Sequence, residues 1–247
     1  NDLFAFTAEG DPNSGIIVGD DSVMVIDAQA TPTLARQVIQ KVRSVTDKPI
    51  SHLVLSHYHA VRVLGASEYK ANNIIMSSKA RSMVAERGQE DWDSEFDRFP
   101  RLFKGHEEIP GLTWPTTTFD KKMSLFLGKR RVDLYFLGRA HTAGDIVIHV
   151  PDSNVLFTGD IVEYKSACYC GDAHLQDWPK TLGKIAKFQA VSLVPGRGDA
   201  LTDPRQINDA IELTEDFVTS TFKSVSKIAY AGGDLKEAMS SCRDECD

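Results

Sequence analysis

The polar residues most suited to chemistry in this chain lie just beyond short apolar runs. His57, His59, His141 and Asp160 each follow a run rich in Val, Leu, Ile or Phe. Such runs, bounded by polar or glycine residues, are typical of buried β-strands. The pattern therefore singles out these four residues, each at the end of a predicted strand, as candidates for chemistry.

Strand and helix signals are mixed along the whole chain. The predicted strands are residues 15–19, 22–27, 52–56, 123–127, 131–137, 145–150, 155–158 and 191–194. The predicted helices are residues 31 to about 45, 178–188 and a helical C-terminal tail from about 204 to 225. Since the two kinds of element intermix, the sequence predicts one layered α/β domain over residues 1–247 rather than two domains.

Residues 78–106 differ from this framework because they are charged, aromatic and mostly helical in pattern, with an interruption at Pro100. We interpret them as a helical excursion that could act as a lid. Its aromatic side chains are expected to form the underside of a helical hairpin rather than a substrate groove. These are Trp92, Phe96, Phe99 and Phe103.

Charge and composition restrict the partners. The formal net charge of −7 argues against a nucleic-acid partner, because phosphate binding needs a basic surface. No stretch approaches the roughly 20 apolar residues of a membrane span. The four cysteines, Cys168, Cys170, Cys242 and Cys246, are expected to be reduced thiols of a cytoplasmic protein. A removed export signal stays open, because the sequence starts without Met.

Taken in order, four motifs resemble the metallo-β-lactamase superfamily. They are the His-x-His of residues 57–59, the Gly-x-x-His-Thr-x-Gly of 138–144, the Phe-Thr-Gly-Asp of 157–160 and the Val-Pro-Gly-x-Gly of 194–198. The resemblance implies an αββα sandwich of class α/β (α+β), with two mixed β-sheets flanked by helices. It also implies that metal binds at one edge, between the sheets.

The chain departs from the family pattern at the second metal site. The family has His-x-His-x-Asp-His, but here Val61 stands in place of the Asp and Arg62 in place of the last His. Arg197 stands where the family has another histidine. Of that second site only Asp160, the usual bridging carboxylate, is kept.

The resemblance therefore implies at most one metal ion, with His57, His59, His141 and Asp160 as the candidate ligands. Three imidazoles and an open position suit zinc, and His/Asp ligation suits iron as well. The expected cofactor is one zinc, with iron or no metal as alternatives.

The two arginines have two interpretations. Arg62 and Arg197 could both pair with Asp160, or one guanidinium could bind a substrate carboxylate, phosphate or oxyanion. We take Asp160 and Arg197 as candidate catalytic residues. Arg62, Arg197 and Tyr58 are the candidate substrate-binding residues.

Three functions agree with these residues. The first is a metal-dependent hydrolase of a small ester or thioester that uses a mononuclear site. The second is a non-catalytic or metal-free member that binds an anionic ligand through Arg62 and Arg197. The third is a mononuclear iron oxygenase or an enzyme of sulfur compounds. Antibiotic β-lactamase activity is not expected, because Val61 cannot accept a hydrogen bond from a nucleophilic water. The expected partner is a small, anionic molecule, and the oligomeric state stays open.

Overall fold

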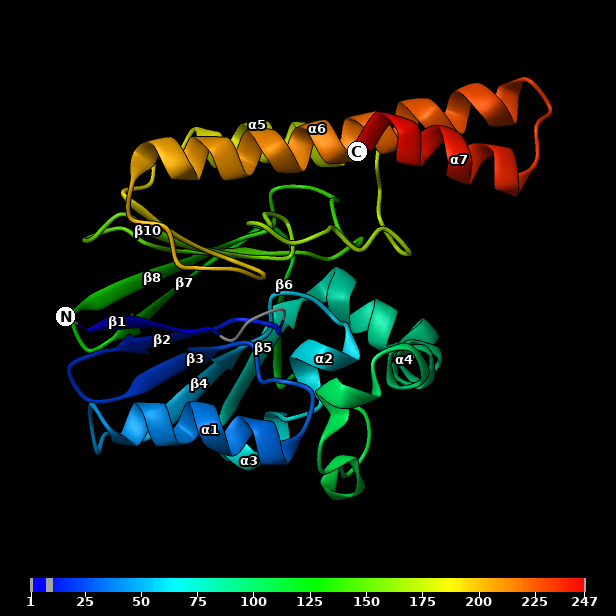
Figure 1. The fold of residues 1–247 in the computed structure, drawn as a ribbon. Coiled ribbons are helices and arrows are strands. Elements are labelled where there is room, and N and C mark those ends of the chain that lie inside the picture. Colours follow the sequence, from blue (N-terminus) through cyan, green and yellow to red (C-terminus); the bar gives the residue numbers. More distant parts are fainter. Residues whose placement is uncertain (1, 8–10, 247) are drawn as a thin grey trace.

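A computed structural model describes residues 2–7 and 11–246 of the protein. In this part of the chain two mixed β-sheets lie face to face between two layers of helices (Figure 1). This arrangement confirms the predicted αββα sandwich of class α/β. The first sheet has the strand order β1 (Leu3–Phe6), β2 (Ser14–Val18), β3 (Val23–Ile26), β4 (Ile50–Val54), β5 (Asn73–Ser77) and β6 (Thr117–Phe119).

The direction of the strands places the polar loops. Strands β3, β4, β5 and β6 are parallel to one another, whereas β1 and β2 are antiparallel to their neighbours. The second sheet has the order β11 (Ser192–Pro195), β10 (Val155–Gly159), β9 (Val147–Val150), β8 (Arg130–Tyr135) and β7 (Lys122–Leu127). Only β10 and β11 are parallel within it. The loops after β4, β8, β10 and β11 carry the candidate site.

Three apolar layers hold the sandwich together. The core between the sheets is formed by inward side chains such as Ile17, Val54 and Phe157. A second layer packs the outer face of the first sheet against α1 (Pro32–Arg43), α2 (Ala60–Val63), α3 (Ala66–Tyr69) and α4 (Ser78–Arg98). A third layer packs the second sheet against α5 (Trp178–Ala186) and α6 (Pro204–Tyr230).

The start of α1 follows the local sequence. Thr31 is the N-cap, and its hydroxyl accepts a hydrogen bond from the backbone N–H of Leu34 at 3.2 Å. Pro32 occupies the first turn, where its missing N–H and fixed φ are no disadvantage. The predicted helix at residues 31–45 is therefore confirmed within two residues at each end.

The predicted helical excursion contains α4 and two short 3-10 helices, η1 (Pro100–Phe103) and η2 (His106–Glu108). Pro100 begins η1, so the predicted interruption is present. Phe103 is buried, but Phe99 is 42% exposed and does not lie under a hairpin. Among the described residues, no helix is both long enough and apolar enough to cross a bilayer.

At the C-terminus, α6 continues past the sheets, and α7 (Leu235–Cys246) folds back along it (Figure 1). The sequence predicted this helix only to about residue 225, and it extends to Tyr230. It did not predict β1, β5 or β6, whose apolar runs are short.

Candidate metal centre

Three histidines come together from the loops that follow β4 and β8. The ring centroids of His57, His59 and His141 lie 4.8 to 4.9 Å apart, and each pair approaches edge to face. All three side chains are buried. The loop of His141 is fixed by Asp145, whose carboxylate accepts from the N–H of Thr142 at 2.7 Å and from its hydroxyl at 2.8 Å. The structure thus gathers the three histidines that the sequence singled out.

A serine fixes the ring of His57. Ser56 Oγ lies 2.8 Å from Asp27 Oδ2 and 3.0 Å from His57 Nδ1. The hydroxyl has one proton, which it donates to the carboxylate, so Nδ1 of His57 must donate in the second contact. A lone pair then remains on Nε2. This buried atom has no hydrogen-bond partner among the described residues.

Oxygen acceptors fix the other two rings in the same way. His59 Nε2 lies 3.0 Å from Asp172 Oδ2, and His141 Nδ1 lies 2.9 Å from the carbonyl oxygen of Tyr169. Because neither a carboxylate nor a carbonyl oxygen can donate, both ring nitrogens carry the proton. When both rings are neutral, the lone pairs on His59 Nδ1 and His141 Nε2 face each other across 3.0 Å. Burial would lower the pKa of His59, but the hydrogen bond to Asp172 and nearby carboxylates raise it, so a metal ion competes with a proton at this ring.

This donor set fits one divalent cation. The ligand atoms of His57, His59 and His141 lie within 4.8 Å of one another. Two nitrogens bound to one tetrahedral zinc would be about 3.3 Å apart, given zinc–nitrogen bonds of about 2.0 Å. Burial lowers the pKa of His57 well below its ordinary value and lowers the pKa of His141 to about 3. Both rings are therefore neutral at pH 7, which is the form that binds metal.

Asp160 is held between the metal centre and the two arginines. Its Oδ2 lies 3.7 Å from His57 Nε2 and 3.5 Å from His141 Nε2, so it is close enough for a fourth ligand. Arg62 contacts Oδ1, and Arg197 Nη1 donates to Oδ2 at 2.9 Å. Burial would raise the pKa of Asp160, but the two arginines hold it well below the ordinary value. Both predicted ion pairs are therefore present.

Arg62 lies in the interior of the protein. Its side chain is 1% exposed, and its terminal nitrogens donate to Asp160, to Asp27 Oδ2 at 3.2 Å and to the carbonyl oxygens of Asn13 and Gly196 at 2.7 Å each. Its Nε has no acceptor among the described residues, but the whole side chain is buried and does not line the cavity, so a ligand in the cavity does not reach it. The predicted contact between Arg62 and substrate is therefore wrong for this geometry, and the residue acts as a buried counter-ion.

Arg197 is different because it reaches the surface of a cavity. Its side chain is 16% exposed, and Nη1 donates both to Asp160 and to Glu163 Oε1 at 2.9 Å. The hydrogen bonds of its side chain to described residues all use Nη1. Burial and the charge of Asp160 raise the pKa of Glu163 to about 7. A substrate-binding role for Arg197 stays a prediction.

Tyr58 does not line this cavity. It is buried, and its hydroxyl donates to Asp172 Oδ2. Arg87 Nη1 pairs with the other oxygen of Asp172 at 2.7 Å. Burial raises the pKa of Tyr58, as does its bond to Asp172, so the phenol is neutral. In place of the predicted substrate contact, Tyr58 and Arg87 position the carboxylate that orients His59.

Two carboxylates of α4 cap the helix that follows His59. Asp91 Oδ2 accepts from the N–H of Ala60 at 2.8 Å, and Glu95 Oε2 accepts from the N–H of Val61 at 2.9 Å. These N–H groups begin α2 and have no acceptor within the helix. Burial and the charge of Asp91 raise the pKa of Glu95 to about 7. The sequence interpretation missed both residues, although acidic residues four apart on one helix share a face.

The group formed by His59, Asp91 and Asp172 also brings potential ligand atoms together. Asp91 Oδ1 lies 3.8 Å from His59 Nε2. The oxygens of Asp172 already accept from Tyr58 and Arg87, which satisfies most of its charge. These carboxylates therefore orient His59 and favour the Nε2–H tautomer, as the outer partners of metal-binding histidines do.

A cavity of about 320 Å³ opens onto two of the three histidines, His59 and His141. His59, His141, Asp160 and Arg197 form its polar side. Its other walls include Val61, Glu95, Phe99, Leu102, Ser166, Cys168 and Tyr169. The volume suits a small molecule. Phe99, which the sequence placed under a helical hairpin, is therefore part of the wall.

Cys168 lies in this wall as a free thiol. Burial and the nearby charge of Glu163 raise its pKa, so the thiol is protonated at neutral pH. A protonated thiol is a poor nucleophile. This environment therefore favours an unreactive Cys168 thiol.

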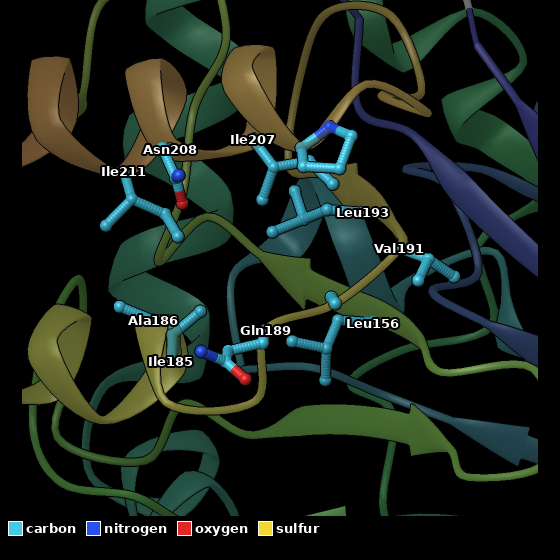
Figure 2. A pocket seen from close by; sticks show the side chains of 11 residues that line it. Leu156, Ile185, Ala186, Gln189, Val191, Leu193, Ile207, Asn208 and Ile211 are labelled. Atoms are coloured by element: carbon cyan, nitrogen blue, oxygen red, sulfur yellow. The ribbon is translucent and has the colours of Figure 1, made fainter.

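A second cavity, of about 310 Å³, lies between α5, α6 and the edge of the second sheet (Figure 2). Figure 2 shows Leu156, Ile185, Leu193, Ile207 and Ile211 around it. None of the residues that line it is titratable. This apolar cavity therefore offers no group for acid–base chemistry or metal binding.

The model of the metallo-beta-lactamase superfamily matches residues 7–196. The chain belongs to this superfamily. The metallo-beta-lactamase type 2 of Bacillus cereus is 24% identical over 204 residues, which cover 80% of this chain and 72% of the relative. The corresponding protein of Bacteroides fragilis is 24% identical over 222 residues, which cover 87% and 79%.

Solved structures of the superfamily share the fold. A metallo-beta-lactamase from Pontibacter korlensis superposes with a TM-score of 0.65 at 19% identity and covers 87% of this chain and 93% of its own. The DIM-1 metallo-beta-lactamase has a TM-score of 0.64 at 16% identity and covers 87% and 94%. At these identities the likeness concerns the fold. The superfamily and the histidine cluster together indicate a metal-binding hydrolase.

Proposed function

We propose that the protein is a metal-dependent hydrolase of a small ester or thioester that works with one divalent cation. The observation that carries this proposal is the convergence of the ligand nitrogens of His57, His59 and His141. His59 and His141 also line a cavity, and His57 is buried behind them. A cation bound there would polarise a carbonyl oxygen and lower the pKa of a water molecule. Three imidazoles with an open position favour zinc.

The side chains around the histidines would bind and orient a small anionic substrate. Arg197 places a fixed guanidinium beside the cavity and could donate to a carboxylate or to the negative charge that develops on a carbonyl oxygen. Phe99 and Leu102 supply apolar surface for the rest of the molecule. The size of the cavity, about 320 Å³, favours a small substrate over a polymer.

Replacement of the second-site ligands supports a single cation. Arg62 and Arg197 bring two positive charges to Asp160. A second divalent cation at this carboxylate would be repelled by both of them. Val61 has an apolar side chain in the cavity wall, which cannot bind a second cation.

The experiment is elemental analysis of the purified protein and of its His57→Ala and His141→Ala variants. About one equivalent of zinc is expected in the parent protein and a large loss in both variants, because each removes one of three ligands. A panel of nitrophenyl esters and thioesters is then assayed with the zinc-loaded protein. One equivalent of iron would favour an oxygenase instead. A protein that takes up no metal would favour the second candidate, an anion-binding member that acts through Arg197.

A further inference from the structure

The proposed hydrolase needs a group that accepts the proton of the attacking water, and the usual carboxylate for this purpose is absent. Val61 cannot accept a proton or a hydrogen bond. Asp160 is a poor substitute, because guanidinium groups of Arg62 and Arg197 contact both of its oxygens. A carboxylate that is saturated by charged donors has little remaining affinity for a proton.

Glu95 lines the same cavity from another element. It lies on α4, and Val61 is part of the same cavity wall. One oxygen, Oε2, accepts the N–H of Val61 at 2.9 Å, and this bond fixes the orientation of the group. No hydrogen bond from a described residue reaches the other oxygen, Oε1.

The surroundings separate Glu95 from the other acidic residues. Asp91, one helical turn earlier, caps Ala60 but does not line the cavity. Asp172 is bonded to Tyr58, His59 and Arg87 and does not line the cavity either. Glu95 is therefore the one cavity carboxylate, among the described residues that line it, whose oxygens are not both paired with guanidinium groups.

We propose that Glu95 is the proton acceptor of this site and takes over the task of the carboxylate that Val61 replaces. This inference rests on the proposed hydrolase function. In the reaction, the O–H bond of water breaks and its proton moves to Glu95 Oε1, while the water oxygen bonds to the carbonyl carbon. The bond from that carbon to the leaving oxygen or sulfur then breaks, and Glu95 returns the proton to the leaving atom.

The test compares the zinc-loaded parent protein with Glu95→Gln and with Asp93→Asn as a matched control. Gln can still accept the N–H of Val61, so the cap on α2 is kept. Asp93 lies on the same helix but is exposed, and its change removes the same charge. We expect the kcat/KM for a nitrophenyl ester to fall about 100- to 10,000-fold in Glu95→Gln and to stay unchanged in Asp93→Asn.

A second readout does not depend on turnover. Acetohydroxamic acid binds a zinc ion and gives its hydroxyl proton to a neighbouring carboxylate. By calorimetry we expect its Kd to rise roughly tenfold or more in Glu95→Gln, since a hydrogen bond to a charged group is lost, with no change in zinc affinity. Glu95→Asp, which keeps a carboxylate, should regain part of the loss.

The outcomes distinguish this inference from the proposed function. If the parent protein and Glu95→Gln bind the hydroxamate equally, the proton-acceptor role of Glu95 is overturned, but the hydrolase assignment is not. A loss of zinc affinity in Glu95→Gln would also overturn that role, because Glu95 would then be a metal ligand. Hydroxamate binding that depends on Glu95, without hydrolysis of any ester or thioester, would support the proton acceptor and overturn the hydrolase assignment. A protein that binds no zinc would overturn both.

Discussion

Removing the buried guanidinium of Arg62 should destabilise the protein strongly. In the native structure this side chain compensates Asp27 and Asp160, which are 2% exposed, and it also binds two backbone carbonyl oxygens. Breaking a buried ion pair by deleting one partner costs about 3–5 kcal/mol, because a charge is left buried without compensation. For Arg62→Met we expect a loss of this size at pH 7.5, out of a total of about 5–15 kcal/mol for an ordinary domain.

The loss of stability in Arg62→Met should depend on pH in a defined direction. Burial raises the pKa of Asp27 from 3.8 to about 6 even though Arg62 lowers it. A carboxyl whose folded pKa is raised binds a proton more readily in the native state, so the stability it confers is lost as pH rises from about 4 to about 6. Without Arg62 this pKa rises further. The destabilisation by Arg62→Met should therefore be smaller at pH 5 than at pH 7.5.

The measurement is urea unfolding of chelator-treated protein at both pH values, followed by circular dichroism. Arg36→Met serves as control, because Arg36 is an exposed arginine that pairs with Glu68 and Glu108 at the surface. Surface pairs contribute little to stability, so this variant should stay close to the parent protein. A loss below about 1 kcal/mol for Arg62→Met at pH 7.5, or a larger loss at pH 5, would refute the reasoning.

Four further predictions concern metal affinity, packing and substrate range. Asp172→Asn should weaken zinc binding about 10- to 100-fold in a competition with a chromophoric chelator, since Asp172 orients His59, and unchanged affinity would contradict this role. Gly65→Ala should cost about 1–3 kcal/mol in urea unfolding, because its Cβ would lie 2.3 Å from the carbonyl oxygen of Ala28. Gly183→Ala, with open space within 4 Å in α5, should instead gain about 0.5–1 kcal/mol. The zinc-loaded protein should not hydrolyse a chromogenic β-lactam in a spectrophotometric assay, and robust turnover would contradict the single-cation interpretation of Val61 and Arg197.

Much of the metal centre follows from the sequence, because local order and strand periodicity carry the signal. A polar residue that follows an apolar strand lies at the end of that strand, whichever strands are its neighbours in the sheet. Periodicity places His57, His59 and His141 after strands, but it was the resemblance of the ordered motifs to the metallo-β-lactamase superfamily that implied they are ligands. The replacements at Val61, Arg62 and Arg197 are visible only against that family pattern.

The tertiary structure decides which side chains are buried and which atoms remain available. Arg62 and Arg197 are the same residue type, so the sequence does not distinguish them. In the structure Arg62 is enclosed by four protein acceptors, whereas Arg197 reaches a cavity. Glu95 belongs to a helix that has no motif. It comes to the site only because α4 packs beside α2 and its carboxylate caps that helix. Contacts between residues far apart in the chain depend on how whole layers pack, and no local pattern contains that information.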